Sequence, residues 1–175
     1  MKHPARILLF TGDGKGKTTA ALGMALRASG HGMRILILQF IKANSSVGEI
    51  AACRHLPGVE IGQTGLGFVP KPSHSSFPGH RRAAEEGLEL ARKALQSGQY
   101  DLVILDEICT AVSRGLLEEE CVIEAVRQAH PVACVVMTGR NATRALIDLA
   151  DTVTEMRSIK HGFAEGRAAE KGVEY

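Results

Sequence analysis

One stretch near the start of the chain constrains the fold more than any other: residues 7–23 read ILLFTGDGKGKTTAALG. Four apolar residues lead into a turn with glycines at alternate positions, and an alanine-rich segment with helical character follows. Glycine tolerates positive φ and lets backbone N–H groups approach an anion, and the start of the next helix adds its positive dipole end. This order of strand, loop and helix is the context that a phosphate-binding loop (P-loop) requires.

Within this loop the polar side chains have expected roles. The ammonium group of Lys17 is placed to reach phosphate oxygens, and the hydroxyl group of Thr18 to ligate a magnesium ion. Thr11 stands where the usual motif has its first glycine, so the loop is a variant. The alternative, a glycine-rich turn with two surface lysines, does not explain why strand, glycines, Lys-Thr pair and helix coincide. The residues expected to bind nucleotide phosphates are Gly12, Asp13, Gly14, Lys15, Gly16, Lys17, Thr18 and Thr19.

Composition excludes several classes of partner. The chain has 175 residues, enough to bury a substantial core. Its net charge of +2 is too small to predict binding to nucleic acid or an anionic membrane, and aromatic residues, at 4%, offer little surface for stacking bases. There is no apolar run long enough to span a membrane and no secretory segment before the first strand. We therefore expect residues 1–175 to form a single cytoplasmic domain that binds neither nucleic acid nor membranes.

The cysteines carry no metal-binding or disulfide pattern. Cys53, Cys109, Cys121 and Cys134 include no Cys-x-x-Cys pair, so we expect free thiols. Cys134 lies in an apolar run and is expected in the core, and Cys109 is expected to pack or to form part of a site wall rather than to act as a nucleophile.

Strand-like and helix-like segments alternate along the chain. Such alternation predicts an α/β fold: a single domain with a mostly parallel sheet and helices on both faces. We expect the helix after the P-loop to end through Gly30 in a C′ position. The expected strands lie at about residues 6–10, 33–40, 59–61, 100–107, 131–137 and 152–156, and the helices at about 17–29, 47–55, 79–97, 118–129 and 142–150.

Two further polar groups follow buried strands. Asp106 and Glu107 end one strand, and Arg140 follows another. Ligands of open α/β sheets sit at the carboxyl ends of strands, where the P-loop also lies. The carboxylates can hold magnesium, and Arg140 can contact phosphate or a substrate carboxylate as a planar fork. The alternatives are solvated acids and a surface arginine paired with Asp148 or another neighbour.

Residues 62–82 form a long segment rich in glycine and proline, without any acidic residue. A loop of this length inside a compact domain is usually functional or mobile. It is either a lid or wall for a bulky substrate, exposing Phe68 and Phe77, or an excursion between two elements. The polar tail from residue 160 to residue 175 is expected to lie over the ligand edge of the sheet or across a partner subunit.

Together these motifs resemble one family. The loop TGDGKGKTTAA at residues 11–21 is similar to that of the ATP:corrinoid adenosyltransferases of cobalamin synthesis and salvage, and the same family accounts for Thr11. The resemblance extends from residue 7 to residue 175, whereas a P-loop alone would fit many nucleotide enzymes. Further matches are Leu105-Asp106-Glu107, Thr138-Gly139-Arg140, DLADTV at residues 148–153, Glu155, Lys160-His161, Phe163, Gly166, Ala169 and GVEY at residues 172–175.

The resemblance implies a P-loop nucleotide-binding (RecA-like) fold and a specific reaction. In that reaction, cobalt(I) of a reduced corrinoid attacks C5′ of ATP, the adenosyl group moves to cobalt and triphosphate leaves. ATP is thus a co-substrate and Mg²⁺ the expected cofactor. Because the reduced metal is itself the nucleophile, the protein must supply position and charge neutralisation. A reductant protein or flavin and a homodimer are implied in the same way.

The resemblance also assigns residue roles. Lys17 and Thr18 would stabilise the leaving polyanion, and Glu107 would be the acidic partner of the metal, with Asp106 beside it. Some members use a Phe-x-Trp pair to press the lower axial ligand off cobalt; here the stretch reads Phe68-Val69-Pro70, so Phe68 is the expected corrinoid contact and the tryptophan has no equivalent. Some members also carry an N-terminal helical extension over the site, which is missing here or replaced from elsewhere.

Two other functions use the same motifs. A small P-loop kinase or NTPase would use Glu107 to position water or an acceptor hydroxyl and would release ADP. A nucleotide-dependent switch would turn over slowly and bind a partner. The matches in the C-terminal half favour adenosyl transfer over both.

Overall fold

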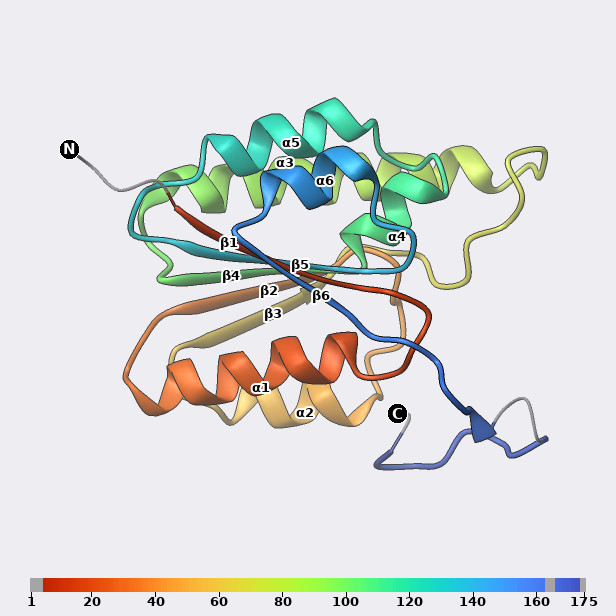
Figure 1. The fold of residues 1–175 in the computed structure, drawn as a ribbon, viewed down its shortest axis with the longest axis horizontal. Helices are drawn as coiled ribbons and strands as arrows, with labels where there is room; N and C mark the ends of the chain where they lie inside the picture. The colour runs from red at the N-terminus through yellow and green to blue at the C-terminus, as the bar shows by residue number, and fades with distance from the viewer. Residues whose placement is uncertain (1–4, 163–165, 174–175) are drawn as a thin grey trace.

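The computed structural model describes residues 5–162 and 166–173 of the chain. Its centre is a six-stranded sheet in the order β3-β2-β4-β5-β1-β6, in which every neighbouring pair of strands is parallel (Figure 1). This confirms the expected α/β class. The strands are β1 Arg6–Thr11, β2 Ile35–Gln39, β3 Val59–Gln63, β4 Leu102–Asp106, β5 Cys134–Thr138 and β6 Thr152–Glu155.

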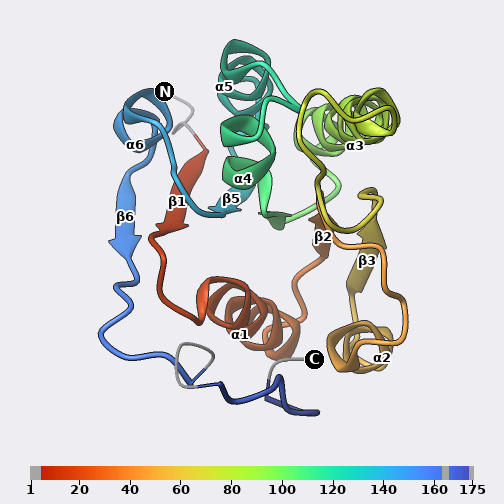
Figure 2. The same cartoon turned by 90° about the vertical axis from the view of Figure 1, so that its right-hand side faces the viewer.

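Helices cover both faces of the sheet. Figures 1 and 2 show α1 and α2 on one face and α3, α4, α5 and α6 on the other. All five residues of β4 are buried, which explains its continuous apolar sequence: a central parallel strand meets helices on both sides. The helices are α1 Lys17–Gly30, α2 Gly48–Arg54, α3 Phe77–Ser97, α4 Ile108–Ser113, α5 Glu119–Arg127 and α6 Arg144–Leu149.

Small side chains bring α1 close to the sheet. Ala21 and Ala25 are fully buried in a cluster with Ile37 and Ile104 of the central strands. On the opposite face of the sheet, larger side chains such as Leu88 and Leu95 of α3 fill the core. The first turn of α1 lies at the carboxyl edge of the sheet, because the P-loop joins it to the end of β1.

The structure differs from the sequence-based expectation at several points. Phe77, expected in the long loop, begins α3 and packs against the core. Gly30 is the last residue of α1, and Gly32 rather than Gly30 has positive φ, at +70°. The short helix α4 is not expected from the sequence, because six residues are too few to reveal a helical period.

Parallel register aligns the carboxyl ends of the strands. Gln39, the last residue of β2, is the register partner of Asp106, and Phe10 of β1 is that of Thr138. After β6 the chain passes the P-loop: the amide of Gly14 donates to the carbonyl of Met156 at 2.6 Å. The last described residues also meet this loop, because Lys15 Nζ donates to the carbonyl of Val173 at 2.9 Å.

Some expectations fall outside the described residues, namely those for Phe163, Glu174 and Tyr175. In the described ranges, none of the helices has both the length and the apolar character needed to cross a membrane.

Candidate active site

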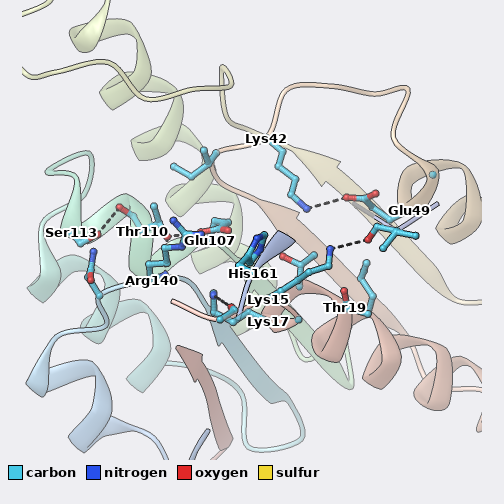
Figure 3. Close-up of a pocket in the computed structure, with 18 of the residues that line it drawn as sticks. Lys15, Lys17, Thr19, Lys42, Glu49, Glu107, Thr110, Ser113, Arg140 and His161 are labelled. Carbon is cyan, nitrogen blue, oxygen red and sulfur yellow. Dashed lines mark hydrogen bonds and ion pairs between the residues drawn. The ribbon is translucent and has the colours of Figure 1, made fainter. Parts of the chain in front are cut away.

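A cavity of about 690 Å³ lies at the carboxyl edge of the sheet (Figure 3). Its wall contains the P-loop residues from Gly14 to Thr19, with Glu107 and Arg140 from the ends of two other strands. The fold therefore brings these expected site residues together. Gly12 and Asp13 belong to the same loop but do not line the cavity. Further wall residues are Leu22, Ile41, Lys42, Gly48, Glu49, Thr110, Ser113, Arg114, Asn141, His161, Gly172 and Val173.

The P-loop encloses its own lysine. Lys17, the first residue of α1, is buried, and its Nζ donates to the carbonyls of Gly12 and Gly14 at 2.6 and 2.7 Å. Burial lowers the pKa of Lys17, and Glu107 opposes that shift. The loop thus holds the ammonium group in one position at the cavity wall.

Backbone contact with the segment after β6 explains two of the loop glycines. A Cβ at Gly12 would lie 2.5 Å from the carbonyl oxygen of Met156, and one at Gly14 would lie 2.6 Å from the same atom. Gly12 also has φ of +96°. Any side chain at these two positions would push β6 away from the loop.

Asp106 is the centre of a buried polar cluster beneath the cavity. The residue is 1% exposed. Its Oδ1 accepts hydrogen bonds from the hydroxyl groups of Thr18, at 2.8 Å, and Thr138, at 2.7 Å. Its Oδ2 accepts from Gln39 Nε2 at 3.1 Å and lies 3.5 Å from Lys42 Nζ. The carboxylate is therefore oriented by groups at the ends of β5 and β2 and by the first turn of α1.

Glu107 has an unusual backbone conformation. Its φ of +63° turns the chain sharply between β4 and α4, so that its side chain reaches the cavity while Asp106 stays below. The Thr110 hydroxyl group donates to Glu107 Oε2 and accepts from the amide of Arg140 at 3.0 Å. Thr110 thereby ties the acidic residue to the loop that carries the arginine.

Arg140 is exposed at the cavity wall. Asp148, its expected alternative partner, pairs instead with Arg144 at 2.9 Å. Arg140 therefore lines the cavity and is not paired with Asp148. This position agrees with the interpretation that Arg140 contacts a phosphate or a substrate carboxylate.

The oxygen atoms at this site suit magnesium. Thr18 supplies a hydroxyl group 2.8 Å from a carboxylate oxygen of Asp106, and the Glu107 carboxylate lies in the same wall. Hydroxyl and carboxylate oxygens, completed by water and substrate phosphates, are the ligands that Mg²⁺ prefers. Within residues 5–162 and 166–173, no three His, Cys, Asp or Glu side chains gather as a dedicated metal site.

Phe68 does not line the main cavity. Its side chain is 90% exposed and borders a neighbouring hollow of about 470 Å³. Ile41 and Lys42 line both the cavity and this hollow, so the two spaces adjoin. The glycine-rich segment thus presents an exposed aromatic residue beside the site.

Sequence reasoning missed several wall residues. Thr110 belongs to the unexpected helix α4, and Lys42 and Glu49 are single charged residues in segments without a motif.

Cys109 is fully buried, and burial raises the pKa of its thiol to about 12, with Glu107 adding to the shift. It packs, as expected, and all four cysteines are free.

Comparison with known proteins assigns the chain to a family. The family model described as "ATP:corrinoid adenosyltransferase BtuR/CobO/CobP" matches residues 4–175. The chain belongs to this family. A corrinoid adenosyltransferase of Pseudomonas aeruginosa is 39% identical over 170 residues, covering 97% of this chain and 83% of the relative. One of Escherichia coli K12 is 38% identical over 172 residues, covering 97% and 85%.

A further relative of this adenosyltransferase is the corrinoid adenosyltransferase CobA of Salmonella typhimurium, 38% identical over 177 residues and covering 97% of this chain and 85% of the relative. Among solved structures, the KaiC-like protein PH0186 of Pyrococcus horikoshii aligns with a TM-score of 0.51 over 89% of this chain and 73% of that protein, at 13% identity. That likeness supports the expected P-loop fold and nothing more specific.

Proposed function

We propose that this adenosyltransferase moves the 5′-deoxyadenosyl group of ATP to cobalt(I) of a reduced corrinoid, in adenosylcobalamin synthesis or salvage. The cobalt electron pair forms the bond to C5′, and the C5′–O bond breaks with its electron pair passing to triphosphate. The observation that carries the proposal is the family match across residues 4–175, which includes the acidic strand end, Arg140 and the tail as well as the P-loop.

The chain's own residues would bind and neutralise the triphosphate. Lys17 and the amides of the P-loop would contact the phosphates from one wall of the cavity, and Arg140 from another. Oriented cations and N–H groups of this kind stabilise charge that develops on a leaving group. The residues proposed to bind ATP are Gly12, Asp13, Gly14, Lys15, Gly16, Lys17, Thr18, Thr19 and Arg140.

Magnesium would be held by Thr18 and Glu107, with Asp106 beside them. When bound, it would neutralise phosphate oxygens and help to fix the triphosphate. Thr138 and Gln39 keep Asp106 oriented, and Thr110 keeps Glu107 oriented, so the acidic groups are positioned before the substrate enters.

Phe68 is proposed as the corrinoid contact. Its exposed ring borders the hollow next to the nucleotide cavity, where a flat, bulky substrate could approach C5′ of ATP. A reductant protein or flavin would supply cobalt(I). A homodimer, a cytoplasmic location and a single domain over residues 1–175 stay predictions.

An anaerobic absorbance assay with corrinoid, ATP and Mg²⁺ tests the proposal. Conversion of the cobalt(I) spectrum into that of a light-sensitive alkyl-cobalt, together with one triphosphate per product, is the expected result. ADP and phosphate with unchanged cobalt(I) would instead establish the kinase or NTPase alternative, which no observation on this chain specifically favours.

A further inference from the structure

Lys42 occupies a position that the P-loop chemistry leaves unexplained. It follows β2 by three residues and lines both the nucleotide cavity and the hollow that Phe68 borders. The cavity close-up shows its side chain pointing toward Glu49 across from the P-loop (Figure 3). A charged side chain common to both spaces stands where a nucleotide and a second substrate in the adjoining hollow would meet.

Two carboxylates hold the ammonium group of Lys42 in place. Its Nζ lies 3.0 Å from Glu49 Oε1 and 3.5 Å from Asp106 Oδ2. The Lys42 side chain is 31% exposed, and those of Glu49 and Asp106 are 18% and 1% exposed. Charged pairs this deeply placed are less screened by solvent than surface pairs. The lysine side chain therefore has a defined position rather than a mobile one.

Lys42 has more N–H donors than its two carboxylate partners use. An ammonium group has three N–H donors. Two acceptors pair with it in the described part of the chain, which leaves one donor for the cavity side.

We propose that Lys42 is a further charge-stabilising residue of the transfer reaction, acting at the junction of the two substrates. Its ammonium group stabilises the negative charge that appears on the triphosphate oxygen as the C5′–O bond breaks. Glu49 and Asp106 fix the group in position beforehand, so little reorganisation is needed during the reaction. This inference rests on the proposed adenosyl transfer and adds a residue that the P-loop motif does not contain.

The role predicts a loss in turnover larger than the loss in ATP affinity. An interaction that strengthens only as the leaving group gains charge lowers kcat when it is removed and leaves ground-state binding nearly intact. A lysine that merely binds ATP would weaken binding and leave kcat unchanged. A lysine that only supports the fold would lower thermal stability without this separation.

Two neutral variants test the proposal. Lys42→Met removes the charge and keeps a side chain of similar length. Lys42→Gln is the second variant, for use if Lys42→Met does not fold, because it removes the charge but can still donate hydrogen bonds to the carboxylates. We expect kcat for adenosyl transfer to fall by about 100-fold in either, while the Kd for MgATP, measured by calorimetry without corrinoid, changes by less than about threefold. Lys42→Arg should recover part of kcat. Lys93→Met, which neutralises an exposed lysine on α3, is the matched control and should match wild type.

The outcomes separate this inference from the proposed function. If wild-type protein forms no alkyl-cobalt product, the proposed function itself fails. If wild type is active and a folded neutral variant retains kcat within twofold, Lys42 has no such role. Equal losses in kcat/KM and in ATP affinity, with kcat unchanged, would also overturn the inference, because Lys42 would then act only in binding.

Discussion

The hydroxyl group of Thr18 lies 2.8 Å from Oδ1 of Asp106, although 88 positions separate the two residues in the chain. Thr18 lies in the first turn of α1, and Asp106 ends β4, a strand separated from β1 by β5. The contact joins the phosphate-binding end of the site to its acidic end. The donor set proposed for magnesium thus depends on the order of strands in the sheet.

Lys17→Ala should abolish adenosyl transfer while the protein stays folded. The variant loses the ammonium group proposed to contact phosphate, and we expect kcat/KM to fall by at least about 100-fold. Loss of the hydrogen bonds from Nζ to two loop carbonyls should cost only about 1–2 kcal/mol of unfolding free energy. The assay is alkyl-cobalt formation, with a thermal melt as the folding control. Near-normal turnover would remove the P-loop lysine from the mechanism.

Gly14→Ala should damage both stability and activity. The added Cβ would meet the carbonyl oxygen of Met156 at 2.6 Å, which is backbone and yields only if β6 shifts. We expect a loss of about 1–3 kcal/mol in urea unfolding. Gly23→Ala is the matched control, because Gly23 lies in α1 and the added carbon would have no atom within 4 Å apart from the adjoining residues and the helix's own backbone. That change should leave stability equal or raise it by up to about 1 kcal/mol. Equal effects of the two substitutions would refute the close-contact explanation.

Thr110→Val should weaken the acidic part of the site without touching its charges. The valine keeps the side-chain shape but loses the donor to Glu107 and the acceptor for the Arg140 amide. We expect activity to fall by about tenfold and half-maximal activity to require more Mg²⁺. Thr110→Ser keeps the hydroxyl group and should retain most activity. A magnesium titration of initial rates distinguishes the two, and indistinguishable curves would show that Thr110 does not support Glu107.

Phe68→Ala should impair turnover with corrinoid more than ATP binding. Because the side chain is 90% exposed, its removal should change unfolding free energy by less than about 0.5 kcal/mol. Ile159→Ala, at a residue 87% exposed just before the tail, serves as the control for loss of exposed apolar surface. The measurement compares corrinoid KM and kcat with the calorimetric Kd for ATP. Unchanged rates and affinity would make Phe68 ordinary loop surface.

Thiol labelling of the native protein should find one fast cysteine. Cys121 is exposed, whereas Cys53 and Cys109 are buried, and burial raises the pKa of both thiols. The pKa of about 12 keeps Cys109 protonated and unreactive at neutral pH. Cys121→Ser should remove the fast phase, and denaturant should expose the remaining thiols. Rapid labelling of Cys109 in the native state would contradict its packing role.

Much of the nucleotide site follows from local sequence. Glycine spacing, Lys17 and Thr18 predict a P-loop because a few adjacent residues supply the turn, the N–H groups and the helix start. Asp106, Glu107 and Arg140 are predicted at the same edge because parallel strands place their carboxyl ends together. The alternation of apolar and helical segments likewise predicts the α/β class, which the parallel sheet confirms.

Only the tertiary structure decided which of these polar side chains reach the cavity and which are buried beneath it. The sequence does not distinguish which of two adjacent acids is buried; positive φ at Glu107 directs that side chain into the cavity and leaves Asp106 with Thr18, Thr138 and Gln39 beneath it. Nor does it reveal Lys42, whose position depends on strand order and on a carboxylate from α2. Local sequence determines local conformation and the chemistry available, whereas contacts between distant residues depend on packing and register, which no single segment specifies.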